Sequence, residues 1–255
     1  MLAAMLGIPA TGVYSKATEG DIGEPRSSYM LGSAKKCEGK LLIVNFFVDT
    51  PKSKWNIQSI KKMKKPLKTA TDYIKEQAAV YDVSVEFVFD WEQNSALYHR
   101  TATNCEPGED ETFENYLDGK IVQWLEYNPT YDELLEKYDA DGVFAIIWFN
   151  TQGRAYAICY DGIDNPDETL VAFSQDSPCV LTHEILHLFG AHDYYEGAEY
   201  STQTVEFLKR EYPNEIMLSV NDGANVKRDV SPLTAYHLGW VESAAETESF
   251  SELIR

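Results

Sequence analysis

The sequence predicts an α/β fold built on a mostly parallel sheet with at least one hairpin. Two observations carry this prediction. Strand-like apolar runs alternate with a helical pattern in the first part of the chain, and three strand-like runs follow one another later; the alternation is typical of parallel strands joined through helices. Two runs, 41–48 and 143–149, are almost entirely apolar, as expected of strands buried on both faces.

The first strand, 41–48, is followed by a helical pattern that ends near Tyr81. Pro66 lies inside that pattern, so the helix is expected either to kink or to begin there. Alternating apolar residues over 83–89 then predict a second strand. The helical pattern consists of apolar residues recurring every three or four positions between lysines: Met63, Leu67, Ala70, Ile74, Ala78 and Tyr81.

Residues 103–139 are acidic and are expected to be helical or loop-like. Three further strands are expected at 143–149, 154–160 and 169–173. In the second of these, large and small side chains alternate, which is typical of an edge strand. The segment 1–40 is interpreted as an N-terminal arm, and 41–255 as a single domain.

Composition excludes several classes of function. The chain of 255 residues has a formal charge of −19, which argues against nucleic-acid binding. No apolar run approaches the roughly 18 residues needed to cross a membrane. The four cysteines contain no Cys-x-x-Cys pair, so a thiolate zinc site is not expected. Their even number permits disulfides without defining a pairing.

The stretch "SPCVLTHEILHLFGAHDYYEG" contains three of the five histidines. Ser177 and Pro178 are a strong helix start, and Gly190 is a plausible helix end. His183 and His187 are four positions apart, so both imidazoles leave the same helix face and can bind one Zn²⁺ ion. Glu184 can then reach a water on the metal without being a ligand.

A catalytic zinc site needs a third protein ligand. After the turn at Gly190, Asp193 can fold back onto the metal, and its neighbour His192 is the rival ligand. A more distant alternative is Glu206, nineteen residues beyond His187. The residues alone leave these three alternatives open.

The segment "HEILHLFGAHD" resembles the metzincin signature of zinc endopeptidases, His-Glu-x-x-His-x-x-Gly-x-x-His/Asp. It is similar to the aspartate variant of snapalysin-like proteases and to immune-inhibitor-A-like peptidases. The resemblance implies that Asp193 is the third ligand, and that His192 points into solvent or makes an outer contact. It also implies that Met217, in "PNEIMLSV", forms the methionine turn beneath the metal.

The resemblance covers about 41–240 and implies a metzincin-like architecture. An upper subdomain of about 41–190 would hold a twisted sheet, an antiparallel edge strand at "RAYAICY" and the zinc helix. A smaller lower subdomain of about 191–255 would hold the methionine turn and a late helix in "SPLTAYHLGWVE". Secretion or a cell-surface location is a further implication of the family.

The leading hypothesis is therefore a zinc-dependent endopeptidase that acts on proteins or peptides, with Glu184 as general base. Some metzincins carry an oxyanion-binding tyrosine two positions after the turn methionine. Here that position is Ser219, so any such donor must come from elsewhere. The alternatives are a gluzincin-like peptidase with Glu206 as third ligand and a non-catalytic binding module that retains the zinc fold.

A second, weaker site lies in the acidic loop Asp161–Glu168, which has carboxylates suited to Ca²⁺. It lacks the EF-hand spacing, so a solvated loop is the favoured interpretation. The sequence defines neither a cleavage preference nor an oligomeric state.

Overall fold

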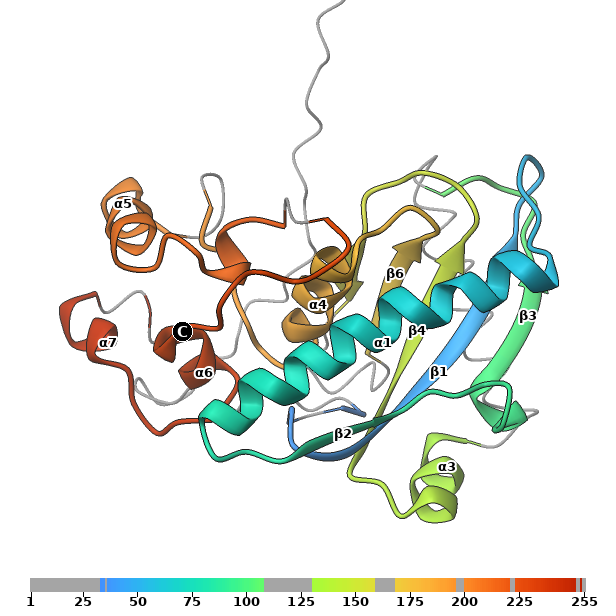
Figure 1. The fold of residues 1–255 in the computed structure, drawn as a ribbon, viewed down its shortest axis with the longest axis horizontal. Helices are drawn as coiled ribbons and strands as arrows, with labels where there is room; N and C mark the ends of the chain where they lie inside the picture. Colours follow the sequence, from blue (N-terminus) through green and yellow to red (C-terminus); the bar gives the residue numbers. More distant parts are fainter. Residues whose placement is uncertain are drawn as a thin grey trace, which may run out of the picture.

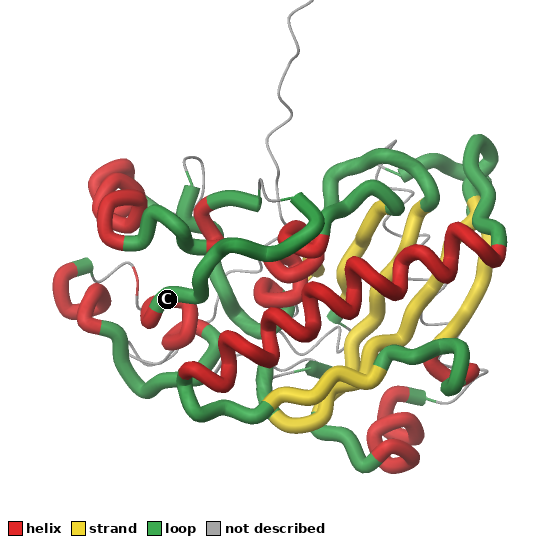
Figure 2. The backbone as a smooth tube through the Cα atoms, viewed as in Figure 1, coloured by secondary structure: helices red, strands yellow, loops and turns green. Residues whose placement is uncertain are grey.

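The computed structural model describes residues 33–34, 36–107, 130–158, 168–195, 200–220, 223–250 and 253. These residues form a mixed α/β fold around one six-stranded sheet, with helices on both of its faces (Figures 1 and 2). The predicted N-terminal arm lies mostly outside the described residues, and the first strand already begins at Gly39.

The sheet has the strand order β2-β1-β4-β6-β5, and β3 also pairs with β1. All neighbouring strands are parallel except β5 and β6, which are antiparallel. The sheet is thus mostly parallel with an antiparallel edge strand. The strands are β1 (Gly39–Asp49), β2 (Val85–Val88), β3 (Tyr98–Ala102), β4 (Gly142–Phe149), β5 (Tyr156–Ile158) and β6 (Thr169–Phe173).

The central strands β1 and β4 are buried on both faces, as their apolar runs predict. Leu41, Ile43 and Phe47 of β1 belong to the core beneath helix α1 (Ile57–Val80). Leu42 and Val44 point to the opposite core, which is covered by α3 (Tyr131–Tyr138). Successive residues alternate between the two cores because side chains of a strand alternate between its faces.

Helix α1 runs unbroken through Pro66, so it does not begin there. The helix begins at Ile57, where Asn56 caps its N-terminus. The Asn56 side chain accepts a hydrogen bond from the Ser59 backbone N–H, and the Ser59 hydroxyl accepts one from the Asn56 backbone N–H. Burial of a long apolar face, which includes Leu67 and Ile74, outweighs the roughly 3 kcal/mol cost of an interior proline.

The remaining helices follow the sheet in the chain. Helix α4 (Pro178–His187) packs beside α1 and the sheet, and the later helices lie on the far side of α4 from the sheet (Figure 1). One continuous cluster of buried apolar residues joins α1, α4 and α6. The later elements are α5 (Thr202–Glu211), the 3₁₀ turn η3 (Ile216–Leu218), α6 (Pro232–His237) and α7 (Ala245–Ser249).

Some of the helices and strands in the structure were predicted from the sequence and others were not. The late helix is confirmed as α6, with Ser231 as its cap and Pro232 at its start. The acidic segment contains α3, while 108–129 lies outside the described residues. Strand β3 and the 3₁₀ turn η2 (Ser95–Leu97) were not predicted.

The described cysteines are free thiols: Cys37, Cys105 and Cys179. Cys159 lies outside the described residues. Within the described part of the chain, no helix combines the length and the apolar character needed to cross a membrane.

Candidate metal centre

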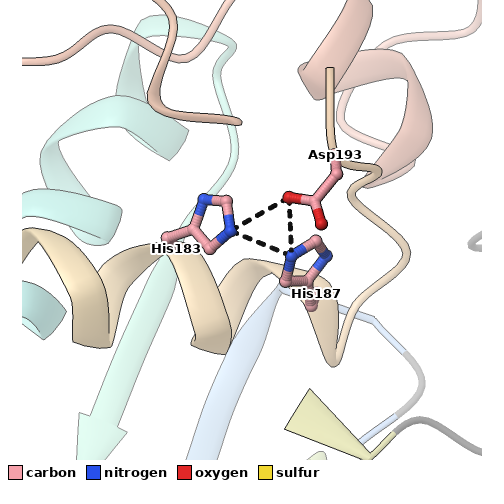
Figure 3. Close-up of side chains that lie close together, drawn as sticks. All are labelled: His183, His187 and Asp193. Atoms are coloured by element: carbon pink, nitrogen blue, oxygen red, sulfur yellow. Dashed lines mark hydrogen bonds and ion pairs between the residues drawn. The ribbon is translucent and has the colours of Figure 1, made fainter. Parts of the chain in front are cut away.

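Helix α4 begins and ends as its sequence predicts. The Ser177 hydroxyl accepts a hydrogen bond from the Val180 N–H (3.3 Å), and Pro178 occupies the first turn. Past the helix end, Gly190 adopts a positive φ of 104°, a conformation that glycine takes without steric cost. The chain reverses there and brings Asp193 back over the helix (Figure 3).

Three side-chain atoms converge at this turn (Figure 3). Nε2 of His183 and Nε2 of His187 are 3.1 Å apart. Asp193 Oδ1 lies 3.1 Å from the first nitrogen and 3.3 Å from the second. Both imidazoles are at least 92% buried, with relative exposures of 5% and 8%, so this convergence lies in a largely desolvated place.

The far nitrogens of both rings contact backbone carbonyls. His183 Nδ1 lies 3.1 Å from Ile216 O, and His187 Nδ1 lies 2.7 Å from Ala191 O. A carbonyl oxygen only accepts, so each Nδ1 must carry the proton. In the neutral rings both Nε2 atoms then present lone pairs, as Asp193 Oδ1 does. Three acceptors that face one another require a cation between them, either a shared proton or a metal ion.

The spacing of these atoms suits a small tetrahedral ion. Ligand atoms bound at roughly 2.0–2.1 Å around a tetrahedral zinc stand about 3.3–3.4 Å apart. The observed separations of 3.1, 3.1 and 3.3 Å are close to this spacing. Two imidazole nitrogens and one carboxylate oxygen, with one position left over, also match the ligand number of catalytic zinc.

Asp193 and His187 each favour the charged form of the other. Burial would raise the pKa of Asp193, but the His183 and His187 rings hold that pKa well below its usual range. Burial would likewise lower the pKa of His187, but the hydrogen bond and charge of Asp193 raise it. The carboxylate therefore stays ionised, which suits it to bind a cation.

Asp193 is held by a second contact that the sequence reasoning missed. Its other oxygen, Oδ2, accepts a hydrogen bond of 2.6 Å from the Tyr195 hydroxyl. Burial, reinforced by the Asp193 charge, raises the pKa of Tyr195, so this phenol keeps its proton and remains a donor. Arg154 in turn donates to the Tyr195 oxygen at 3.3 Å. Orienting hydrogen bonds of this kind raise metal affinity.

Glu184 follows His183 on α4 and is half-buried, outside the ligand group. A second carboxylate, Asp176, lies near enough to sense its charge. Burial raises the pKa of Asp176 to about 6; a hydrogen bond from the Phe173 N–H opposes the rise, and the charge of Glu184 adds to it.

Met217 lies fully buried in η3, a turn that contacts the histidine helix. The preceding carbonyl, Ile216 O, is the partner of His183 Nδ1. Met217 O accepts from the N–H of Tyr194, the residue after Asp193, at 3.0 Å. The turn therefore contacts both the first histidine and the chain segment that carries Asp193.

The alternative ligands lie elsewhere. His192 is buried beside His237, with ring centroids 4.8 Å apart, so it does not point into solvent. His237 Nε2 contacts Leu253 O at 2.8 Å, consistent with a structural role. Glu206 is exposed on α5. Neither His192 nor Glu206 belongs to the converging group.

Most of the acidic loop considered for Ca²⁺, 161–167, lies outside the described residues. Its last member, Glu168, is buried, and its carboxylate accepts hydrogen bonds from the Ala34 N–H and, at 3.3 Å, from the Ser33 hydroxyl. That side chain is therefore part of the packing between the N-terminal segment and β6.

Comparisons with known proteins add no family. No family model matches the chain, and no curated protein matches it. A solved structure described as "Structure of a chaperone-substrate complex" is similar over 85% of this chain, at 10% identity and a TM-score of 0.35. The match spans 35% of that chain's length. At this TM-score the likeness carries no argument about fold or function.

Proposed function

We propose that this protein is a zinc-dependent endopeptidase whose metal ligands are His183, His187 and Asp193. The observation that carries the proposal is the convergence of three acceptor atoms at separations of 3.1–3.3 Å. Because backbone carbonyls hold the protons of both rings on Nδ1, the group is arranged to receive a cation. A nitrogen-rich set with one oxygen favours zinc over magnesium or calcium, which prefer oxygen ligands.

The chemistry follows from the residue beside the ligands. Zinc, when bound, acts as a Lewis acid that polarises a peptide carbonyl and makes a water molecule more acidic. Glu184 accepts the proton of the attacking water and later delivers it to the leaving amine. This role is supported by its position next to His183 on the same helix and by its absence from the converging group.

Other residues hold the site in place. Tyr195 fixes one oxygen of Asp193 and leaves the other for the ion. Ile216 and Ala191 orient the two rings through their carbonyls. Such pre-organisation matters because a catalytic group that is free to rotate is correctly placed for only part of the time.

A metzincin-like architecture is part of the proposal. It is supported by the spacing from His183 to Asp193, by the buried Met217 turn that contacts His183 through Ile216, and by the antiparallel edge strand β5. In this architecture the edge strand would border the cleft that receives an extended peptide.

Digestion of denatured casein by the zinc-loaded protein tests the activity. We expect cuts at internal peptide bonds, identified by mass spectrometry of the new termini. Casein that stays intact with the fully zinc-loaded protein would contradict the proposal and favour a non-catalytic binding module.

A further inference from the structure

We propose that Arg154 binds a carboxylate of the peptide substrate, so that this site selects acidic peptides. The inference rests on the proposed function and deepens it, since it names the class of substrate. The carboxylate can belong to an Asp or Glu side chain near the cleaved bond or to the free C-terminus of a short peptide. Both sources present the same chemistry to a guanidinium.

Arg154 reaches the metal centre through a short chain of contacts. Its guanidinium donates to the Tyr195 hydroxyl at 3.3 Å, and that hydroxyl donates to Asp193 Oδ2 at 2.6 Å. The opposite oxygen of Asp193 is one of the three converging atoms. Arg154 is itself exposed, so its charge stands at the surface only two side chains away from the candidate ion.

The backbone around Arg154 is held in place. Gly153 lies so close to the Phe173 ring that a Cβ at this position would fall 2.2 Å from ring atoms. Ala155 is buried, and β5 begins at Tyr156, where it pairs with β6. The arginine is therefore anchored at the start of the edge strand that is proposed to border the cleft.

The Arg154 guanidinium can donate more hydrogen bonds than it makes to the described residues. It offers five N–H groups, and Tyr195 accepts from one of them. Among the described residues Arg154 makes no ion pair, whereas Arg100 pairs with Asp49 and Arg210 with Glu211. A guanidinium in this state is ready to bind an external carboxylate with two hydrogen bonds.

The charge around the site makes this role distinctive. The chain carries −19 overall, and the carboxylates of Glu184 and Asp176 lie near the site. A peptide carboxylate that lies away from the zinc ion would be repelled by this field unless a second cation offset it. Arg154 is a cation in that place, and its fixed position selects where along the peptide the acid must lie.

The test uses blocked peptides built around one bond that the protein cuts in casein. Glu, Gln or Lys is placed in turn at each position flanking that bond, and a further pair ends in a free carboxylate or an amide. kcat/KM is measured for the native protein, Arg154→Ala and Arg154→Glu. Arg210→Ala, which removes the same charge from α5, is the control. Binding of the same peptides to the Glu184→Gln variant, with and without Arg154→Ala, provides a readout apart from turnover.

We expect kcat/KM for Glu over Gln to be about ten- to a hundredfold higher at one position, in the range of one charge-assisted hydrogen-bonded contact. This preference disappears in Arg154→Ala and reverses toward Lys in Arg154→Glu. It persists in Arg210→Ala, which cuts neutral peptides at the native rate. A preference confined to free C-terminal carboxylates would identify the C-terminus as the source.

Two results would overturn the inference: cleavage without any preference for a carboxylate, or a preference that survives in Arg154→Ala. If no peptide is cut at all, the proposed function fails, and the binding measurements then decide the role of Arg154 separately. Tighter binding of Glu than Gln peptides that depends on Arg154 would support it, and equal binding would refute it.

Discussion

The Nδ1 atom of His183 lies 3.1 Å from the carbonyl oxygen of Ile216, 33 residues later in the chain. This contact connects the histidine helix to the turn that contains Met217. It also fixes the proton of the ring on Nδ1, which leaves Nε2 to face His187 and Asp193. The same contact therefore both positions the turn and sets the protonation of a proposed metal ligand.

The first prediction concerns the general base. Glu184→Gln should retain zinc but lose at least about a hundredfold in kcat, because an amide cannot accept the proton of the attacking water. Glu206→Gln, on the exposed face of α5, is the matched control and should cut at the native rate. Native turnover in Glu184→Gln would show that another group is the base.

The second prediction concerns the third ligand. Asp193→Ala should weaken zinc binding by more than about a hundredfold, beyond the range of outer contacts, because it removes one of three ligand atoms. His192→Ala should weaken it far less, since the His192 ring packs against His237 instead. Zinc affinity is measured by competition with a chelating dye. Equal affinity in Asp193→Ala and the native protein would reopen the case for Glu206.

The third prediction concerns the buried turn. Met217 is fully buried, so Met217→Ala should lower the free energy of unfolding by about 2–5 kcal/mol through a cavity. Met217→Leu conserves the volume and should cost under about 1.5 kcal/mol. Urea unfolding with zinc present measures both. If the two variants were equally stable, the Met217 side chain would not be packed as tightly as its full burial indicates.

The fourth prediction concerns pH. Burial and the charge of Glu184 raise the pKa of Asp176 from 3.8 to about 6, so the folded protein holds this proton more tightly than the unfolded chain. Ionisation of Asp176 therefore lowers the free energy of unfolding. This loss is absent below about pH 4 and complete above about pH 6. The free energy of unfolding of the native protein should fall across this window relative to Asp176→Asn.

This comparison is made by urea unfolding in EDTA, so that loss of metal at low pH does not contribute. The asparagine can still accept from the Phe173 N–H, which keeps the two proteins comparable. A difference in stability that is constant from pH 4 to 7, or that grows in favour of the native protein, would contradict the raised pKa.

The fold was predictable where local pattern and burial agree. The apolar runs of β1 and β4 need both faces covered, and both strands lie at the centre of the sheet. Strand β3 escaped prediction because "YHRTA" has no apolar alternation. It pairs along the second half of β1, and Arg100 bonds to Asp49 and to the Trp55 carbonyl, contacts that only the tertiary structure supplies.

In the candidate site, too, the local contacts were easier to predict than those between distant segments. His183, His187, Gly190 and Asp193 lie within eleven residues, so helical spacing and one turn made Asp193 a candidate ligand. The family resemblance then favoured it over His192 and Glu206. The contacts of Ile216 and Arg154 join segments that are far apart in the sequence. A contact through a backbone carbonyl does not depend on the residue type, so the sequence pattern does not indicate it. Tyr195 has a local signal, two positions after Asp193, but nothing in the pattern indicates where its hydroxyl points.

The most direct test of the account is a zinc titration of the metal-free protein, with bound zinc and casein cleavage followed in the same samples. The account predicts that cleavage is absent without metal, rises in proportion to bound zinc and reaches its maximum at about one zinc per chain. A Glu184→Gln sample titrated in parallel should bind the same zinc and remain inactive, which excludes a contaminating protease. Cleavage that persists in metal-free protein, or full occupancy by zinc with no cleavage, would contradict the central claim.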